Sequence, residues 1–379
     1  MSRLFLPFPL GSLILHNRFL RSATAERMAS SEGLLLPTAA DLYRRLAEGG
    51  VGLIVTGHAS VSPEGKAHPK MTGIYADFHL SGLKGATEAV HRAEGRIAIQ
   101  INHSGGMKEV DLDQGPPLAP SPYLNPLTGH RTRELSEQEI ERIIDDFGQA
   151  ARRAVIAGFD GIQIHAAHGY LANQFLSPLT NRRKDRWGGS LENRSRFLLS
   201  VYRRVRQEVG PDYPLLCKLA ISDFMEGGLT VEEGLQVAGW LAEAGIDGLE
   251  ISGGLAGSRY QKGRSDLEWM KEEAYFSPYT RMVKQRVKVP VILVGMMRNL
   301  EVMERMVTEG CADLIALSRP LIREPDLVIR FREGIQLSST CTSCNRCTGP
   351  SRQEPIACHY EQHVPASYDL ANPRPQNKS

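Results

Sequence analysis

Two histidines and a tyrosine stand close together where an apolar run ends, in the stretch GIQIHAAHGY. His165, His168 and Tyr170 carry side chains that donate hydrogen bonds or protons near neutral pH. Polar side chains of these types at the end of an apolar run are candidates for catalysis. The residues alone leave other interpretations open: the histidines as metal ligands or structural residues, and Tyr170 as a packing residue.

The composition is that of a globular protein and excludes several classes. Of the 379 residues, 41% are hydrophobic and 23% are charged, with a formal net charge of +2. The chain has no basic block interleaved with aromatic residues, which argues against nucleic acid as a partner. It also has no run of eighteen apolar residues, and prolines, a glycine and charges interrupt its N-terminal stretch. We therefore expect a cytoplasmic protein with no membrane partner.

Eight short, nearly continuous apolar runs recur along the chain and predict buried parallel strands. Helical patterns separate them, with S/T-x-x-E capping boxes at Ser136–Glu139 and Thr230–Glu233 and a glycine near several helix ends. No G-x-G-x-x-G follows the first run, which disfavours a doubly wound sheet, so we predict a (β/α)8 TIM barrel. The runs cover residues 18–23, 52–57, 97–102, 161–166, 215–220, 248–253, 291–295 and 314–318.

The two ends of the chain predict additions to the barrel. The turn at Gly11 and Ser12 predicts an N-terminal hairpin that closes the barrel floor. The alternating pattern stops near residue 335, so we assign 1–335 to the barrel. Residues 336–379 are assigned to a cysteine-rich extension with a loose C-terminal tail.

Chemistry in a TIM barrel belongs at the C-terminal ends of the strands, where the connecting loops converge. The loops after the last two strands often bind phosphate in this fold, and Arg319 suits phosphate oxygens, although a surface arginine is the alternative. Together these residues suggest a flat polar ligand with a phosphate tail. The candidate ligand-binding residues are Ser22, Ala23, Thr24, Gly57, His58, Gln100, Lys218, Gly295, Ser318 and Arg319.

The stretch HAAHGYLANQFLSPLTNRRKDRWGGSLENRSRF resembles the signature of the Old Yellow Enzyme family of flavin-dependent ene-reductases. NRFLRSAT, LIVTGHASVSPEG, IQINHSG, CKLAISDF and LSRPLIREPDL support the resemblance in the same order. It implies a barrel that holds FMN and uses NAD(P)H as reductant. Within the signature, NRRKDRWGGSLENR is expected to order the loop after the fourth strand and to cap the next helix.

The resemblance also implies roles for the candidate residues. Ser22, Ala23, Thr24, Gly57 and His58 match segments along the flavin, and Gln100 matches the glutamine that pairs with its pyrimidine edge. Lys218 falls where many members carry an arginine that stabilises reduced flavin. Gly295, Ser318 and Arg319 match the phosphate grip, with Ser318 replacing a common glycine.

For the opening cluster, the resemblance implies catalysis of alkene reduction. His165 and His168 resemble the pair that donates hydrogen bonds to a substrate carbonyl oxygen, and Tyr170 resembles the proton donor to the α-carbon. The expected reaction is the NAD(P)H-dependent reduction of activated C=C bonds in small α,β-unsaturated carbonyl substrates. Homo-oligomers are expected from the resemblance only.

Four cysteines crowd together near the C-terminus with the spacing C-x2-C-x2-C-x10-C. Such thiolates suit Zn²⁺ or a [4Fe–4S] cluster, and unliganded cysteines are the third interpretation. The segment resembles the cluster motif of the trimethylamine dehydrogenase and 2,4-dienoyl-CoA reductase branch, although its last gap is shorter. That likeness implies a cluster and raises FMN-dependent amine oxidation or demethylation as an alternative function. A non-catalytic barrel scaffold is the second alternative. The cysteines are Cys341, Cys344, Cys347 and Cys358.

Overall fold

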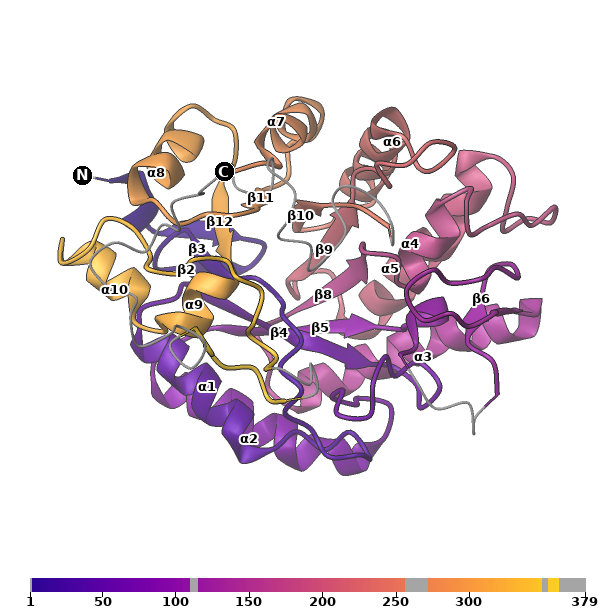
Figure 1. Ribbon diagram of the computed structural model, residues 1–379, viewed down its shortest axis with the longest axis horizontal. Coiled ribbons are helices and arrows are strands. Elements are labelled where there is room, and N and C mark those ends of the chain that lie inside the picture. The colour runs from indigo at the N-terminus through magenta and orange to yellow at the C-terminus, as the bar shows by residue number, and fades with distance from the viewer. Residues whose placement is uncertain (1, 110–114, 256–271, 350–353, 361–379) are drawn as a thin grey trace, which may run out of the picture.

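Eight parallel strands close into a barrel in the computed structural model (Figure 1), which describes residues 2–109, 115–255, 272–349 and 354–360. Every strand overlaps one of the predicted apolar runs, so the (β/α)8 TIM barrel is confirmed. In spatial order the strands are β10 (Gly248–Ser252), β11 (Val291–Val294), β12 (Leu314–Leu317), β3 (Phe19–Arg21), β4 (Leu53–Ser60), β5 (Ile97–Asn102), β8 (Gly161–Ala166) and β9 (Leu215–Ala220).

Helices alternate with the strands and cover the outside of the barrel (Figure 1). Both predicted capping boxes are present, Ser136 with Glu139 and Thr230 with Glu233. The α-helices are α1 (Pro37–Glu48), α2 (Leu80–Arg92), α3 (Glu137–Ile156), α4 (Leu171–Leu176), α5 (Leu191–Val209), α6 (Val231–Glu243), α7 (Ser277–Arg286), α8 (Leu300–Thr308), α9 (Arg319–Arg323) and α10 (Leu327–Arg332). Shorter elements are the 3-10 turns η1 (Arg3–Phe5), η2 (Asp77–His79) and η3 (Gly105–Met107) and the strand pair β6 (Leu118–Ala119) and β7 (Arg133–Glu134).

The predicted N-terminal hairpin is formed by β1 (Phe8–Leu10) and β2 (Leu13–Leu15), which pair antiparallel. Gly11 adopts a φ of +59° in the turn, a value that suits glycine. Leu10 and Leu15 are fully buried against inward-facing residues near the starts of the barrel strands. The hairpin therefore closes the N-terminal end of the barrel, as predicted. The strand residues in this cluster are Leu20, Leu53, Val55, Ala98, Leu216, Ile292, Leu314 and Ala316.

Further along the strands, the barrel interior changes from apolar to polar. Side chains alternate across a strand, so the residue two positions after an inward-facing one also faces inward. Two positions beyond Leu20, Ala98 and Leu216, the inward residues are polar, and two neighbouring strands contribute further polar residues at the same level. This buried polar layer consists of Ser22, Gln100, Gln163, Lys218 and Glu250.

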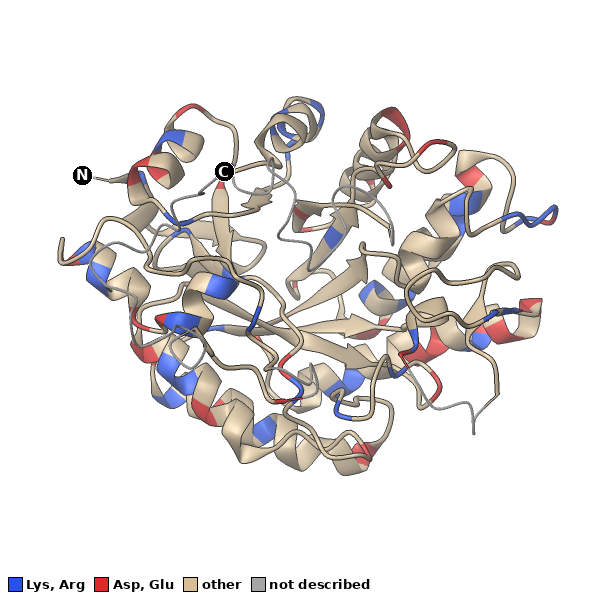
Figure 2. Ribbon diagram, viewed as in Figure 1, with Lys and Arg blue, Asp and Glu red and all other residues tan. Residues whose placement is uncertain are grey.

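Most charged residues lie on the outer helices and the loops, and the strands are largely uncharged (Figure 2). Among the described residues, no helix is both long and apolar enough to cross a membrane. The predicted loose tail lies outside the described residues, and the domain boundary at residue 335 stays a prediction.

The floor hairpin gives a stability prediction. Leu10→Ala should lower the free energy of unfolding by about 2–5 kcal/mol, because it leaves a cavity beneath the barrel strands. Urea unfolding followed by circular dichroism measures this loss. Ile14→Ala is the matched control on the same hairpin, since Ile14 is 65% exposed, and it should change stability by no more than about 0.5 kcal/mol. Equal effects of the two substitutions would contradict a packed floor.

Candidate active site

The turn between β8 and α4 presents the three predicted catalytic side chains. His165 lies near the end of β8, and Tyr170 is the N-cap residue of α4. Between them, His168 has a φ of +62° and Gly169 a φ of +77°. A positive φ is uncommon for residues other than glycine. The chain therefore makes a tight, irregular turn that brings His165, His168 and Tyr170 to the barrel mouth.

Side chains from α4 and from β10 fix this turn. The Gly169 N–H donates to Asn173 Oδ1 at 2.8 Å, and Gln174 Nε2 donates to the Gly169 carbonyl at 2.5 Å. His168 Nε2 lies 2.6 Å from Ser252 Oγ at the end of β10. Sequence reasoning missed Asn173, Gln174 and Ser252 as supports. The sequence signal for Asn173 and Gln174 was two polar residues four and five positions after Gly169. The structure buries both of them, together with the rest of α4.

The predicted catalytic residues form one aromatic cluster. The ring centroids of His165 and Tyr170 are 4.8 Å apart, and those of His165 and His168 are 5.3 Å apart. His58, from the end of β4, lies 5.1 Å from Tyr170, and His68 lies 6.2 Å from His58. Burial raises the pKa of Tyr170 above the ordinary tyrosine value, so its phenol stays protonated at neutral pH.

The buried polar layer beneath this cluster is a continuous chain of hydrogen bonds. Gln100 Nε2 donates to Gln163 Oε1 at 2.7 Å, and Gln163 Nε2 donates to Glu250 Oε2 at 2.9 Å. Glu250 Oε1 accepts from Lys218 Nζ at 2.8 Å and from Ser22 Oγ at 2.6 Å. Burial alone would raise the pKa of Glu250, but the Lys218 charge and the donated hydrogen bonds bring it below its ordinary value.

Gln100, Lys218 and Ser22 were predicted as site residues, and the structure connects them. Gln163 and Glu250, which join them, were missed. Each is a polar residue inside an apolar strand, which was the available sequence signal. Gln163 also stands two positions before His165, so the two side chains face the same side of β8.

A second buried network supports the ends of β3 and β4. Arg21 Nη2 lies 2.8 Å from Glu26 Oε1, which also accepts from the Tyr43 hydroxyl at 2.8 Å and the Gly57 N–H at 2.7 Å. A Cβ atom on Gly57 would come within 1.8 Å of Glu26 Oε2 and 2.6 Å of the Thr24 carbonyl. Gly57 is therefore required by the local packing, independently of any ligand.

The residues predicted to bind phosphate lie after β11 and β12. Thr24 Oγ1 and Ser318 Oγ are 2.7 Å apart and join the ends of β3 and β12. Gly295 has a φ of +127°, a value open to glycine. Arg319 begins α9, and its guanidinium donates to the Ser343 carbonyl at 3.1 Å and to Asn345 Oδ1 at 2.6 Å. The structure thus directs this predicted phosphate residue toward the cysteine segment. Ala23, which was also predicted to bind the ligand, is half-buried and packs against the apolar cluster that contains Leu10 and Leu15.

The four cysteines line a single pocket on the barrel side of the extension, together with three arginines. Burial and the neighbouring Cys341 and Cys344 thiols raise the pKa of Cys347 to about 11. Arg323 Nη1 donates to Cys358 Sγ at 3.3 Å. Among the described residues, no three His, Cys, Asp or Glu side chains are placed to hold a metal ion. The pocket gathers Cys341, Cys344, Cys347 and Cys358 with Arg319, Arg323 and Arg346.

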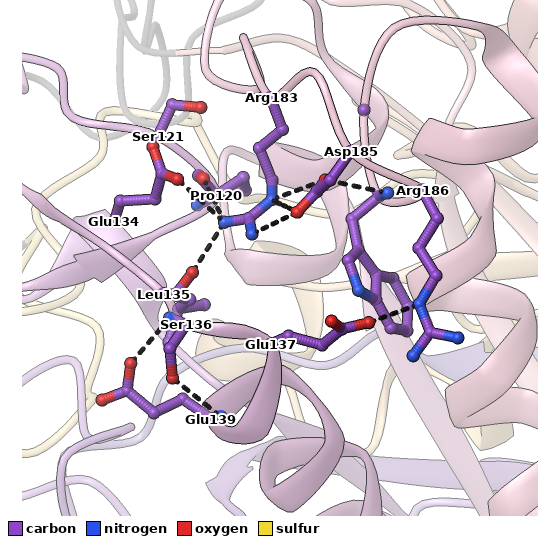
Figure 3. A network of polar contacts seen from close by, with 12 residues as sticks. Pro120, Ser121, Glu134, Leu135, Ser136, Glu137, Glu139, Arg183, Asp185 and Arg186 are labelled. Carbon is purple, nitrogen blue, oxygen red and sulfur yellow. Dashed lines mark hydrogen bonds and ion pairs between the residues drawn. The ribbon is translucent and has the colours of Figure 1, made fainter.

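The basic loop before α5 has a structural role (Figure 3). Arg183 is buried and donates to the carbonyls of Pro120 at 3.0 Å and Leu135 at 2.6 Å, while Asp185 lies 2.6 Å from its guanidinium. Ser190, at the end of the loop, accepts from the Asn193 N–H as the N-cap of α5. This agrees with the expectation that the segment orders the loop and caps the next helix.

Residues 3–338 match the model of the NADH:flavin oxidoreductase / NADH oxidase family. The chain belongs to this family. It is 39% identical over 340 residues to an NADH oxidase from Thermoanaerobacter brockii, covering 89% of this chain and 52% of the relative. An NADPH dehydrogenase from Bacillus subtilis is 34% identical over 326 residues, with 85% of this chain and 92% of that one covered. The resemblance inferred from the motifs is thereby confirmed.

Solved structures agree with this assignment. The old yellow enzyme homologue from Zymomonas mobilis superposes with a TM-score of 0.78 and 29% identity, covering 94% of this chain and 99% of that one. A 2-naphthoyl-CoA reductase in complex with 2-naphthoyl-CoA superposes with a TM-score of 0.86 and 28% identity, covering 94% of this chain and 56% of that one. The chain spans about half the length of the first curated relatives that it matches.

The Arg21–Glu26 pair gives a testable prediction. Glu26→Gln should lower the free energy of unfolding by about 3–5 kcal/mol, because the Arg21 charge stays buried without its counter-charge. Chemical denaturation of the purified variant measures the effect. The control is Glu48→Gln, which breaks the exposed Arg44–Glu48 pair and should cost at most about 1 kcal/mol. If both variants lost equally little, Glu26 would not be holding the ends of β3 and β4.

Proposed function

We propose that this chain is an NAD(P)H-dependent flavin oxidoreductase that binds FMN at the barrel mouth and reduces activated C=C bonds. The observation that carries the proposal is the cluster of His165, His168 and Tyr170 directly above a buried polar layer. Membership of the NADH:flavin oxidoreductase family supports it. The substrates are small molecules with an alkene conjugated to a carbonyl or a similar electron-withdrawing group.

The chemistry of the polar layer suits a flavin. The pyrimidine edge of an isoalloxazine carries both acceptors and a donor, and the Gln100 amide can donate as well as accept. The Lys218 ammonium suits the negative charge of a reduced flavin. The remaining residues proposed to line the cofactor are Ser22, Ala23, Thr24, Gly57 and His58 along the ring and Gly295, Ser318 and Arg319 at the phosphate.

Each catalytic side chain has a distinct role in this proposal. When bound, FMN supplies the hydride chemistry. His165 and His168 bind the substrate carbonyl oxygen and stabilise the negative charge that builds on it. Tyr170 holds a proton on its phenol, because burial keeps the pKa of that group high, and donates it to the α-carbon.

Removal of one oxyanion donor should slow the reaction strongly. His165→Ala is expected to lower the rate at which cyclohexenone reoxidises the reduced holoenzyme by about 10²–10³-fold, with FMN content unchanged. Anaerobic stopped-flow absorbance at the flavin band measures this rate. His91→Ala is the control, since His91 pairs with Asp160 on the outer surface, and its rate should match the wild type.

Two results would overturn the proposed function. A folded protein that takes up no FMN would favour the scaffold alternative. A flavoprotein whose reduced form reacts with no enone in an anaerobic panel would contradict alkene reduction.

Amine oxidation is the second candidate function. The cysteine segment motivates it, and so does an N,N-dimethylglycine/sarcosine dehydrogenase from Chromohalobacter salexigens, which is 33% identical over 358 residues and is covered by this chain over 50% of its length. It predicts that a methylated amine reduces the flavin without NAD(P)H. Ene-reduction predicts that only NAD(P)H does so.

We also propose that the cysteine pocket holds a [4Fe–4S] cluster. Four thiols from one short segment line the pocket, and cationic Arg323 and Arg346 complement the negative charge of a thiolate-bound cluster. The residues therefore suit the group in number, type and surrounding charge. The proposed ligands are Cys341, Cys344, Cys347 and Cys358.

Analysis of anaerobically purified protein tests the cluster. We expect about four iron and about four acid-labile sulfide per chain, both lost in Cys347→Ser. Cys311→Ser, which changes a buried cysteine away from the pocket, should retain both. Zinc without sulfide, or no metal at all, would contradict the cluster.

A further inference from the structure

An ion pair lies buried inside the barrel, directly in the polar layer. The side chains of Lys218 and Glu250 are only 5% and 0% exposed, and Nζ lies 2.8 Å from Oε1. Taking two charges out of water costs more than their attraction usually returns, so such a pair is weak support for stability. Two residues earlier on the same strands, the inward positions are occupied by Leu216 and Gly248, which carry no charge. A role in the proposed flavin site would account for a buried ion pair in the polar layer.

The strand register fixes the pair. Glu250 on β10 stands opposite Lys218 on β9, and Lys218 stands opposite His165 on β8. The buried Arg21 is paired separately, with Glu26. Among the described residues, Glu250 is the carboxylate that pairs with Lys218 inside the barrel.

Glu250 also determines which way two amides point. A carboxylate only accepts hydrogen bonds, so Gln163 must turn its NH₂ group toward Glu250 and its carbonyl oxygen toward Gln100. Gln163 Oε1 then takes one N–H of Gln100. The second N–H and the oxygen of the Gln100 amide then remain for a ligand. Glu250 sets their orientation through Gln163.

We propose that Glu250 is a positioning residue of the flavin site. It offsets the Lys218 charge and, through Gln163, orients the Gln100 amide. This inference rests on the proposed FMN site. By partly neutralising Lys218, Glu250 limits the preference of the site for negatively charged reduced flavin, which keeps the bound flavin more strongly reducing.

Glu250→Gln tests both effects at once. Without the carboxylate, the full Lys218 charge acts on the flavin. The affinity for reduced FMN relative to oxidised FMN should rise about tenfold, which is about +30 mV for a two-electron couple. The new amide either places its NH₂ group against the Lys218 ammonium, or turns that group toward Gln163, whose amide can then turn over and reverse the Gln100 amide. The affinity for oxidised FMN should therefore fall several-fold. Redox titration and FMN binding to the apoprotein measure the two quantities.

Opposite signs separate this role from a merely structural one. Lys218→Met leaves the Glu250 charge unbalanced and should shift the affinity ratio about tenfold the other way, whereas Glu250→Asp should restore it to within about twofold of wild type. Glu233→Gln, which alters the Arg194–Glu233 pair outside the barrel, should leave the ratio unchanged.

The inference is overturned if Glu250→Gln binds FMN with an affinity ratio within twofold of wild type, or with a lower one. If that variant does not fold, an unchanged ratio in Lys218→Met overturns it instead. Failure of the proposed function looks different, because wild-type protein would then bind no FMN or leave every enone unreduced.

Discussion

The buried ion pair between Lys218 and Glu250 determines the polar residues in the C-terminal half of the barrel. An ammonium group at this depth needs a partner, since an isolated charge in a low-dielectric interior is strongly unfavourable. Glu250 supplies that partner from the next strand, with 2.8 Å between the charged atoms. The second carboxylate oxygen must then be satisfied, and Gln163 and Gln100 extend the chain of hydrogen bonds across two further strands. One charge therefore determines the residue types at several neighbouring inward positions.

The apolar floor makes this polar layer possible. The hairpin residues Leu10 and Leu15 pack against the lower strand residues and keep water out from below. The polar layer therefore lies between this apolar end and the C-terminal end of the barrel, where His165, His168 and Tyr170 lie. Electrostatic interactions are stronger in such buried, low-dielectric surroundings than in water. The division of the barrel into two halves is thus a condition for the proposed chemistry as well as a packing solution.

The sequence was sufficient for the fold because the relevant signals are local. Apolar runs, capping boxes and glycines at helix ends each act within a few residues, and all eight strands formed where such runs occur. The motif resemblance also identified His165, His168 and Tyr170, which the structure brings together. Glu250 was missed for a physical reason. A polar residue within a strand can face either the helices or the barrel axis, and the strand of Glu250 carries no predicted site residue that would mark its inward face. Gln163 could have been found, since it alternates with His165. Ser252 was missed similarly, since its contact with His168 joins distant segments.

For Arg319, the position after the last barrel strand was predicted, but the direction in which its side chain points was not. Its guanidinium bonds Ser343 and Asn345 of the cysteine segment. That segment touches the barrel a second time, where the Ile356 N–H donates to the Glu26 carbonyl at 2.8 Å. The Glu26 side chain in turn accepts from Gly57 at the end of β4. The extension is therefore fastened to both sides of the barrel mouth, at Arg319 after β12 and at Glu26 after β3. A segment attached in this way helps to hold the ends of β3 and β12 in place, independently of whether its cysteines bind a cluster as proposed.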